Sequence, residues 1–145
     1  HRTVHRLLHD VLARGGVIAG SSAGASIQGD YMPRGDPLGN TVMMAEGYEQ
    51  GLGFLTGAAI DQHFTQRNRL PDLQSLVKTY PQLLGIGIDE GTALIVQGSQ
   101  GEILGPGKVT FLDLRGEPSD GEPAATVVAA GQRFDLSERR LVGER

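Results

Sequence analysis

GGVIAGSSAGA, residues 15–25, is a short apolar run that ends in a turn of small residues with a serine at its apex. Gly20, Ser22 and Gly24 spell G-x-S-x-G, the pattern of a nucleophile elbow, in which a strand reverses sharply into a helix and exposes a serine hydroxyl. Flanking glycines suit this turn because the strained backbone leaves almost no room for side chains. The pattern makes Ser22 a candidate nucleophile, although similar runs also form ordinary strand-to-helix turns and phosphate-binding loops.

The composition is that of one soluble globular domain, residues 1–145, with enough apolar sequence to bury a core. A formal net charge of −4 without blocks of like charge predicts neither a nucleic-acid nor a membrane-surface partner. The sequence has no cysteine, which excludes disulfides, a thiolate nucleophile and thiolate metal sites. No apolar run is long enough to span a bilayer and the N-terminal segment is charged, so we expect a cytoplasmic protein.

Hydrophobic periodicity predicts the remaining elements. Apolar residues at helical spacing predict a helix over 1–14 and another over 67–80, with Leu70 among the buried positions of the second. A third helix over 22–29 follows the elbow, and prolines and glycines predict a loop over 30–46. Short apolar or alternating runs predict strands at 17–19, 58–60, 84–88, 92–97, 102–104, 108–114 and 124–130, the last four forming two C-terminal hairpins. We expect residues 136–145 to form an edge or a frayed tail.

Two further patterns, a histidine repeat and an Arg-Gly-Asp tripeptide, do not indicate a function here. His1, His5 and His9 recur every four residues, as in a metal-binding ladder, but they flank the apolar stripe of the first helix and no converging ligand is evident. We therefore predict no metal site and no cofactor. Arg34-Gly35-Asp36 matches the tripeptide that adhesion receptors bind, which we interpret as coincidence in a glycine-rich chain.

Ser22, His63 and Glu90 each follow a predicted strand, where an open α/β sheet places its functional groups. A serine, a histidine that takes its proton and a carboxylate that orients the histidine make a hydrolytic triad. Backbone N–H groups after the elbow, that of Ala23 first, could stabilise an oxyanion. The order of the three residues differs from α/β-hydrolases, chymotrypsin and subtilisin, which argues against those folds. Taken singly, His63 could be an ordinary strand-end histidine and Glu90 a helix cap.

Three linked motifs carry a resemblance to a known family. They are Gly20-Ser-Ser-Ala-Gly-Ala25, Asp61-Gln-His-Phe64 followed by Arg67 and Arg69, and Gly85-Ile-Gly-Ile-Asp-Glu90 with Thr92-Ala93. Together they resemble cyanophycinase and its relatives among the aspartyl dipeptidase serine peptidases, over roughly residues 15–96. The resemblance implies an α/β fold: a three-layer αβα sandwich of the class I glutamine amidotransferase-like type, with a mostly parallel sheet and C-terminal hairpins.

The same resemblance implies the chemistry. It makes the protein a serine-type peptidase that hydrolyses aspartyl peptide bonds, with β-aspartyl-arginine as one candidate substrate. Ser22 would be the nucleophile, His63 the base and Glu90 the acid of the triad. The residues that would line the substrate pocket are Asp61, Gln62, Arg67 and Arg69. The two arginines could grip a substrate carboxylate, or could instead be solvated charges on the following helix.

Two departures from the family qualify these expectations. The family usually has an arginine where this chain has Asp72, which favours a broader aspartyl-peptide hydrolase; Asp72 could pair with Arg69 at i, i+3 and draw it away from the substrate. The family also has roughly a hundred more residues before the elbow, about half of such a domain. We therefore expect an N-terminal segment or companion chain to complete the sheet, and a homodimer. The competing interpretation is a non-catalytic fragment or paralogue that binds acidic peptides or serves as an interaction module.

Overall fold

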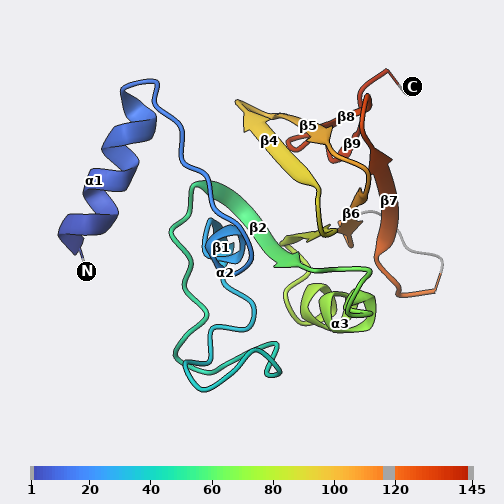
Figure 1. The fold of residues 1–145 in the computed structure, drawn as a ribbon. Coiled ribbons are helices and arrows are strands. Elements are labelled where there is room, and N and C mark those ends of the chain that lie inside the picture. The colour runs from blue at the N-terminus through green and yellow to red at the C-terminus, as the bar shows by residue number, and fades with distance from the viewer. Residues whose placement is uncertain (1, 116–119, 144–145) are drawn as a thin grey trace.

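The computed structural model describes residues 2–115 and 120–143, which contain three helices and nine strands (Figure 1). In chain order these are α1 (Arg2–Ala13), α2 (Ala23–Ser26), β1 (Gly29–Tyr31), β2 (Leu55–Gln62), α3 (Leu70–Thr79), β3 (Leu84–Ile88), β4 (Ala93–Gln97), β5 (Gln100–Leu104), β6 (Lys108–Asp113), β7 (Ala124–Ala129), β8 (Arg133–Asp135) and β9 (Arg140–Leu141). None of the helices in these two ranges has the length and apolarity needed to cross a membrane.

Two sheets organise the fold. The larger has the strand order β1-β2-β3-β6-β7, in which β1–β2 and β2–β3 are parallel and the remaining pairs are antiparallel. The smaller is an antiparallel sheet of order β4-β5-β8-β9. The α/β class is therefore confirmed, and so are both C-terminal hairpins, as β4–β5 and β6–β7.

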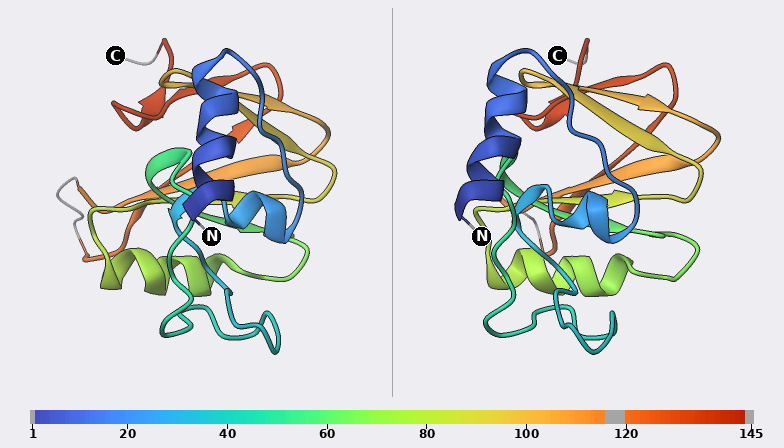
Figure 2. Two further views of the ribbon diagram at one scale, coloured as in Figure 1. Left: turned by 90° about the vertical axis from the view of Figure 1, so that its left-hand side faces the viewer. Right: turned by 60° about the vertical axis from the view of Figure 1, so that its left-hand side comes forward.

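The core lies on both faces of the larger sheet. On one face α3 packs through Leu73, Leu76 and Val77, all fully buried, and Figure 2 shows this helix running along the sheet. On the other face Phe111 of β6 stacks on Phe134 of β8, with ring centroids 3.7 Å apart, and joins the two sheets. Burial on both faces explains why β2 and β3 read as nearly continuous apolar runs.

The expected strand at 17–19 is wrong. Residues 17–21 form no helix or strand and belong to neither sheet, and Val17 is 82% exposed. A strand requires a hydrogen-bonded neighbour, and none pairs with this segment within the described residues. Local sequence gives the apolar character of a strand but not the partner that would complete it.

The helix expected over 67–80 begins later, at Leu70. Arg69 is its N-cap and Pro71 occupies its first turn, where the missing N–H of proline costs no hydrogen bond. Leu70, expected to be buried, is 40% exposed. A side chain at the first helical position lies over the turn that precedes the helix, here away from the sheet.

Helix α1 stands apart from the sheets and has no buried residue (Figure 1). Its contact with the remaining structure includes two histidines: His5 Nε2 and His9 Nε2 hydrogen-bond the Leu52 carbonyl oxygen at 2.9 and 2.7 Å. The His9 ring also packs on Phe54, with centroids 4.7 Å apart. These side chains therefore hold α1 against the loop that leads into β2.

Candidate active site

The backbone at Ser22 has the strained conformation that an elbow requires. Its φ of 52° and ψ of −122° lie in a region that non-glycine residues rarely adopt. Ser22 is the N-cap residue of α2, and its carbonyl accepts the Ala25 N–H at 2.9 Å. The Ala23 N–H has no hydrogen-bond partner within residues 2–115 and 120–143. This N–H therefore remains available beside the serine hydroxyl, at the start of a helical turn.

The two glycines of the G-x-S-x-G motif differ in how much they are needed. A Cβ at Gly20 would lie 2.2 Å from the Gly24 carbonyl oxygen, so no larger residue fits without moving the turn. A Cβ at Gly24 would meet nothing within 4 Å among the described residues. The expectation that both flanking positions exclude side chains holds for Gly20 alone.

We accordingly expect Gly20→Ala to lower the free energy of unfolding by about 1–3 kcal/mol, the usual cost of overpacking. Gly24→Ala, the matched control within α2, is expected to be neutral or to stabilise by up to about 1 kcal/mol through helix propensity. Urea unfolding measures both. Equal effects of the two substitutions would contradict the close approach of Gly20 to the Gly24 carbonyl.

His63 follows directly on β2 and is held by the turn after it. Its own φ is 48°, a second strained non-glycine conformation near the elbow. Phe64 is buried, its N–H donates to the Ile88 carbonyl at 3.2 Å, and its ring fills the space that a Cβ at Gly87 would need. Because β2 and β3 are parallel with Gln62 beside Ile88, the residues after each strand leave the sheet at the same edge.

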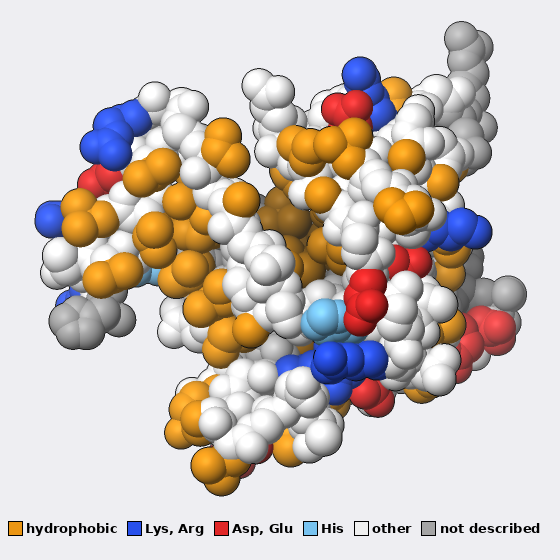
Figure 3. Space-filling view, viewed as in Figure 1, with side chains coloured by type: hydrophobic (Ala, Val, Ile, Leu, Met, Phe, Trp, Pro, Cys, Tyr) orange, Lys and Arg blue, Asp and Glu red, His pale blue; other side chains and the backbone are white. Residues whose placement is uncertain are grey.

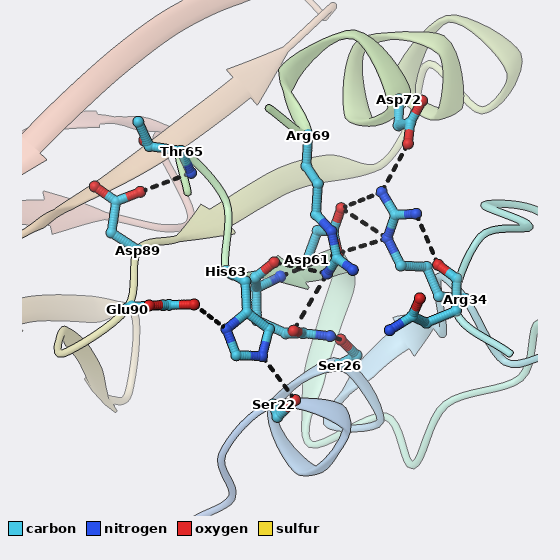
Figure 4. Close-up of polar contacts among 12 residues, drawn as sticks. Ser22, Ser26, Arg34, Asp61, His63, Thr65, Arg69, Asp72, Asp89 and Glu90 are labelled. Carbon is cyan, nitrogen blue, oxygen red and sulfur yellow. Dashed lines mark hydrogen bonds and ion pairs between the residues drawn. The ribbon is translucent and has the colours of Figure 1, made fainter. Parts of the chain in front are cut away.

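The structure brings Ser22, His63 and Glu90 together. Ser22 Oγ lies 3.0 Å from His63 Nε2, and His63 Nδ1 lies 2.8 Å from Glu90 Oε1, as Figure 4 shows. The His63 side chain is 25% exposed and that of Glu90 51% exposed. With Nδ1 donating to the carboxylate, Nε2 is left as an acceptor for the serine proton. This arrangement can activate a serine hydroxyl as a nucleophile.

The neighbouring carboxylate, Asp89, points the other way (Figure 4). Its Oδ1 accepts the Thr65 N–H at 3.0 Å and its Oδ2 accepts the Lys108 N–H at 3.1 Å. The Glu90 backbone N–H donates to Gln66 Oε1 at 3.0 Å, which ties Glu90 to the turn after His63. Asp89 thus joins two chain segments, whereas Glu90 turns its carboxylate to the histidine.

Two of the four expected pocket residues, Asp61 and Arg69, are buried. Asp61 is fully buried, and Arg69 Nη1 lies 3.2 Å from Asp61 Oδ1. The same Nη1 donates to the Gln62 carbonyl at 2.8 Å and to Gln62 Oε1 at 3.2 Å, and the Gln62 amide donates to Ser26 Oγ at 3.3 Å. Burial lowers the pKa of Arg69 although Asp61 opposes the shift. Gln62 lies between this pair and the elbow helix.

Arg67 is exposed in the turn after His63, where its N–H donates to the His63 carbonyl at 3.0 Å. The possible pairing of Asp72 with Arg69 does not form: Asp72 Oδ2 instead accepts a hydrogen bond from Arg34 Nη2 at 2.8 Å. Arg69 is turned inward to Asp61, which leaves Asp72 to a residue from another segment.

Arg34 was not among the residues expected at the site and stood out only as part of the adhesion tripeptide. Its side chain is 5% exposed and pairs with both Asp61 and Asp72. Burial alone would lower the pKa of Arg34, but the hydrogen bonds and charges of the two carboxylates outweigh it and raise that pKa. The signal in the sequence is slight, an arginine between two prolines in a loop without hydrophobic periodicity.

A cleft of about 700 Å³ opens beside these groups. Ser22, Gln62, His63 and Glu90 lie along it, and apolar residues of the elbow segment and of β4 line its walls. Figure 3 shows the hollow, with apolar side chains on its walls and a histidine with acidic and basic side chains at one end. A substrate in this cleft would reach the serine hydroxyl with charged groups close by.

Comparison with known proteins identifies a family to which this chain is similar. The family model of peptidase family S51 matches residues 1–104. The chain is similar to the cyanophycinase of Trichormus variabilis, with 37% identity over 89% of this chain and 49% of that protein, and to the cyanophycinase of Geminocystis herdmanii, with 39% identity over 66% and 36%. A solved peptidase structure from an acI-B1 actinobacterium shares 24% identity over 79% of this chain and 43% of that one, with a TM-score of 0.49. The chain thus spans half or less of the length of these relatives.

Proposed function

The chain belongs to peptidase family S51, and on this premise we propose that it is a serine-type peptidase that hydrolyses aspartyl peptide bonds through Ser22, His63 and Glu90. The observation that carries the proposal is the pair of contacts at His63, 3.0 Å to Ser22 Oγ and 2.8 Å to Glu90 Oε1. Two relatives that the chain resembles are named cyanophycinases, which supports a peptide substrate.

In this mechanism Ser22 Oγ attacks the scissile carbonyl carbon while His63 Nε2 takes the hydroxyl proton. Glu90 stabilises the imidazolium that forms, and the Ala23 N–H donates to the oxyanion of the tetrahedral intermediate. His63 then gives its proton to the leaving amine, and the C–N bond breaks to leave an ester on Ser22. Water, deprotonated by His63, attacks that ester and releases the acid product and the serine.

The proposed pocket has two layers. Gln62, which lines the cleft, and the exposed Arg67 would contact the substrate, and the guanidinium of Arg67 could bind an aspartyl carboxylate through charge-assisted hydrogen bonds. Asp61 and Arg69 would shape the pocket from behind, because their side chains are buried and occupied with one another.

Arg67→Ala is expected to raise KM for aspartyl dipeptides about tenfold with little change in kcat, because it removes a contact made equally in ground and transition states. Arg140→Ala, which removes another exposed arginine, from β9, is the matched control and should leave KM unchanged. Steady-state kinetics on α- and β-aspartyl dipeptides measures both. An unchanged KM in Arg67→Ala would remove Arg67 from the substrate site.

Labelling by a fluorophosphonate probe tests the proposed function, because only an activated serine reacts with it. We expect the label on the peptide that contains Ser22, and hydrolysis of aspartyl dipeptides but not of their alanyl counterparts. A folded protein that neither reacts with the probe nor cleaves the dipeptides would refute the peptidase assignment and favour a non-catalytic peptide-binding protein.

The finer architecture is part of the same proposal. We propose the three-layer αβα sandwich of the class I glutamine amidotransferase-like type, with an N-terminal segment or companion chain completing the sheet. The support is that the larger sheet ends at β1 within the described part of the chain, so β1 is an edge strand to which a further strand could add. Assembly as a homodimer, with an aspartyl peptide as the small partner, remains a prediction that sedimentation of the purified protein can check.

A further inference from the structure

Arg34 joins three separate segments below the cleft. It lies in the loop between β1 and β2, at a φ of 58°, a left-handed conformation that non-glycine residues seldom take. Its Nη1 donates to the Asn40 carbonyl at 3.0 Å within the loop, and its Nη2 donates to Asp72 on α3 at 2.8 Å. Its Nε and Nη2 also lie 3.1 Å from the carboxylate oxygens of Asp61 at the end of β2. All three guanidinium nitrogens are occupied, so Arg34 is not free to bind a ligand itself.

Among the described residues, Arg34 supplies three of the five hydrogen bonds that the Asp61 carboxylate accepts. Its Oδ1 accepts from the Gln62 N–H at 3.0 Å and from Arg69 Nη1 at 3.2 Å as well as from Arg34. Within the described residues its Oδ2 accepts from Arg34 alone, at 3.1 and 3.3 Å. A fully buried carboxylate that loses such a partner is strongly destabilised, since no water replaces the lost bonds.

Arg69 links this carboxylate to the cleft. One nitrogen of Arg69, Nη1, is shared between Asp61 and both oxygens of Gln62. If Arg34 were absent, the uncompensated Asp61 charge would draw that nitrogen toward itself and away from the Gln62 side chain. Gln62 would then lose the donor that fixes its amide in the cleft next to His63.

We propose that Arg34 is a positioning residue that sets the orientation of Gln62 in the substrate pocket by holding Asp61. The role of Gln62 in a substrate pocket rests on the proposed function. The contacts that Arg34 makes with Asp61 and Asp72 do not depend on it. Arg34 also fastens the loop over 32–54 to α3 through Asp72. One guanidinium therefore determines both the rear of the pocket and the position of the loop beneath it (Figure 4).

Arg34→Gln tests the proposal in three measurements on the purified protein. Hydrogen–deuterium exchange should rise in peptides that cover residues 32–50 and 61–69, and not in those that cover β6. KM for β-aspartyl dipeptides should rise about tenfold, the size expected when a charged hydrogen-bonding partner is lost. The rate of fluorophosphonate labelling should stay within about twofold of the parent rate, because the probe reacts with Ser22 activated by His63 and does not require Gln62. Arg34→Lys keeps the charge but loses the planar guanidinium that bonds both Asp61 and Asp72. Its hydrogen–deuterium exchange and its KM should lie between those of the parent and of Arg34→Gln.

Arg139→Gln is the matched control. Arg139 also has a positive φ, of 55°, a side chain that is 7% exposed, and an ion pair, with Asp113 at 2.8 Å. It lies between β8 and β9, outside the residues that line the cleft, so its loss should change stability without changing KM. If Arg34→Gln fails to fold, Asp72→Asn, which frees one anchor of Arg34, should raise exchange in 32–50 and raise KM by a smaller factor.

The outcomes separate the two proposals. Absence of labelling and of hydrolysis in the parent would refute the proposed peptidase function. The change in hydrogen–deuterium exchange on Arg34→Gln would still decide whether Arg34 holds Asp61. Unchanged exchange in 61–69, or a rise in KM no larger than that of Arg139→Gln, would overturn the positioning role. A loss of labelling as large as the loss in kcat/KM would also overturn it, because Arg34 would then act on the triad as a whole.

Discussion

Ser22→Ala is expected to lower kcat for aspartyl dipeptides by at least about three orders of magnitude, the usual cost of removing a triad nucleophile. The reason is the contact between Ser22 Oγ and His63 Nε2 at 3.0 Å, which gives the hydroxyl a base. In Ser22→Ala that hydroxyl is gone and His63 has no nucleophile to deprotonate at this position. Fluorophosphonate labelling of the same peptide should disappear. Kinetics with the purified variant, corrected for any contaminating parent enzyme, measures the loss.

Two controls distinguish chemistry from folding. Ser21→Ala should be mild, because the Ser21 side chain makes no hydrogen bond within the described residues, whereas the Ser22 hydroxyl contacts His63. Ser22→Gly should abolish activity like Ser22→Ala but raise the free energy of unfolding by about 1 kcal/mol, since glycine relieves the strain of a φ of 52°. Equal activity of Ser22→Ala and the parent would remove Ser22 from the mechanism. A Ser22→Gly variant less stable than Ser22→Ala would contradict the strain.

The positions of His63 and Glu90 could be predicted from the sequence, because each residue follows a strand of the larger sheet that the local pattern identifies. Short apolar runs at 58–60 and 84–88 predict strands, and parallel strands end at a common edge, so His63 and Glu90 could be expected near one another. The elbow could be predicted for a different reason: Gly20 of its motif has no alternative, because a Cβ there would lie 2.2 Å from the Gly24 carbonyl oxygen.

The parts that sequence did not predict depend on partners distant along the chain. Arg34 reaches Asp61 and Asp72 across 27 and 38 residues, from a loop whose prolines and glycines carry no period. The competing local rule, i to i+3 pairing on a helix, favoured Asp72 with Arg69, and it failed because the fully buried Asp61 holds Arg69. The strand at 17–19 failed likewise, because apolar composition does not supply a paired neighbour.

Glu90→Gln is expected to lower kcat by about two orders of magnitude or more while KM changes little. An amide next to His63 Nδ1 can turn its NH₂ group to that nitrogen, which favours the tautomer with the proton on Nε2, and Nε2 then cannot accept the serine proton. The Glu90 side chain is 51% exposed, so solvent screens part of its charge and the loss should be smaller than for Ser22→Ala.

Asp89→Asn is the matched control, a carboxylate-to-amide change one residue away. Asp89 accepts backbone N–H groups from Thr65 and Lys108, and an amide can accept only one of them and sets its NH₂ against the other. We expect a loss of about 1–3 kcal/mol in the free energy of unfolding with kcat largely kept. Urea unfolding and kinetics on folded protein measure the two effects. A larger drop in kcat for Asp89→Asn than for Glu90→Gln would transfer the orienting role to Asp89, and would mean that the 2.8 Å contact between His63 and Glu90 is not the one that orients the base.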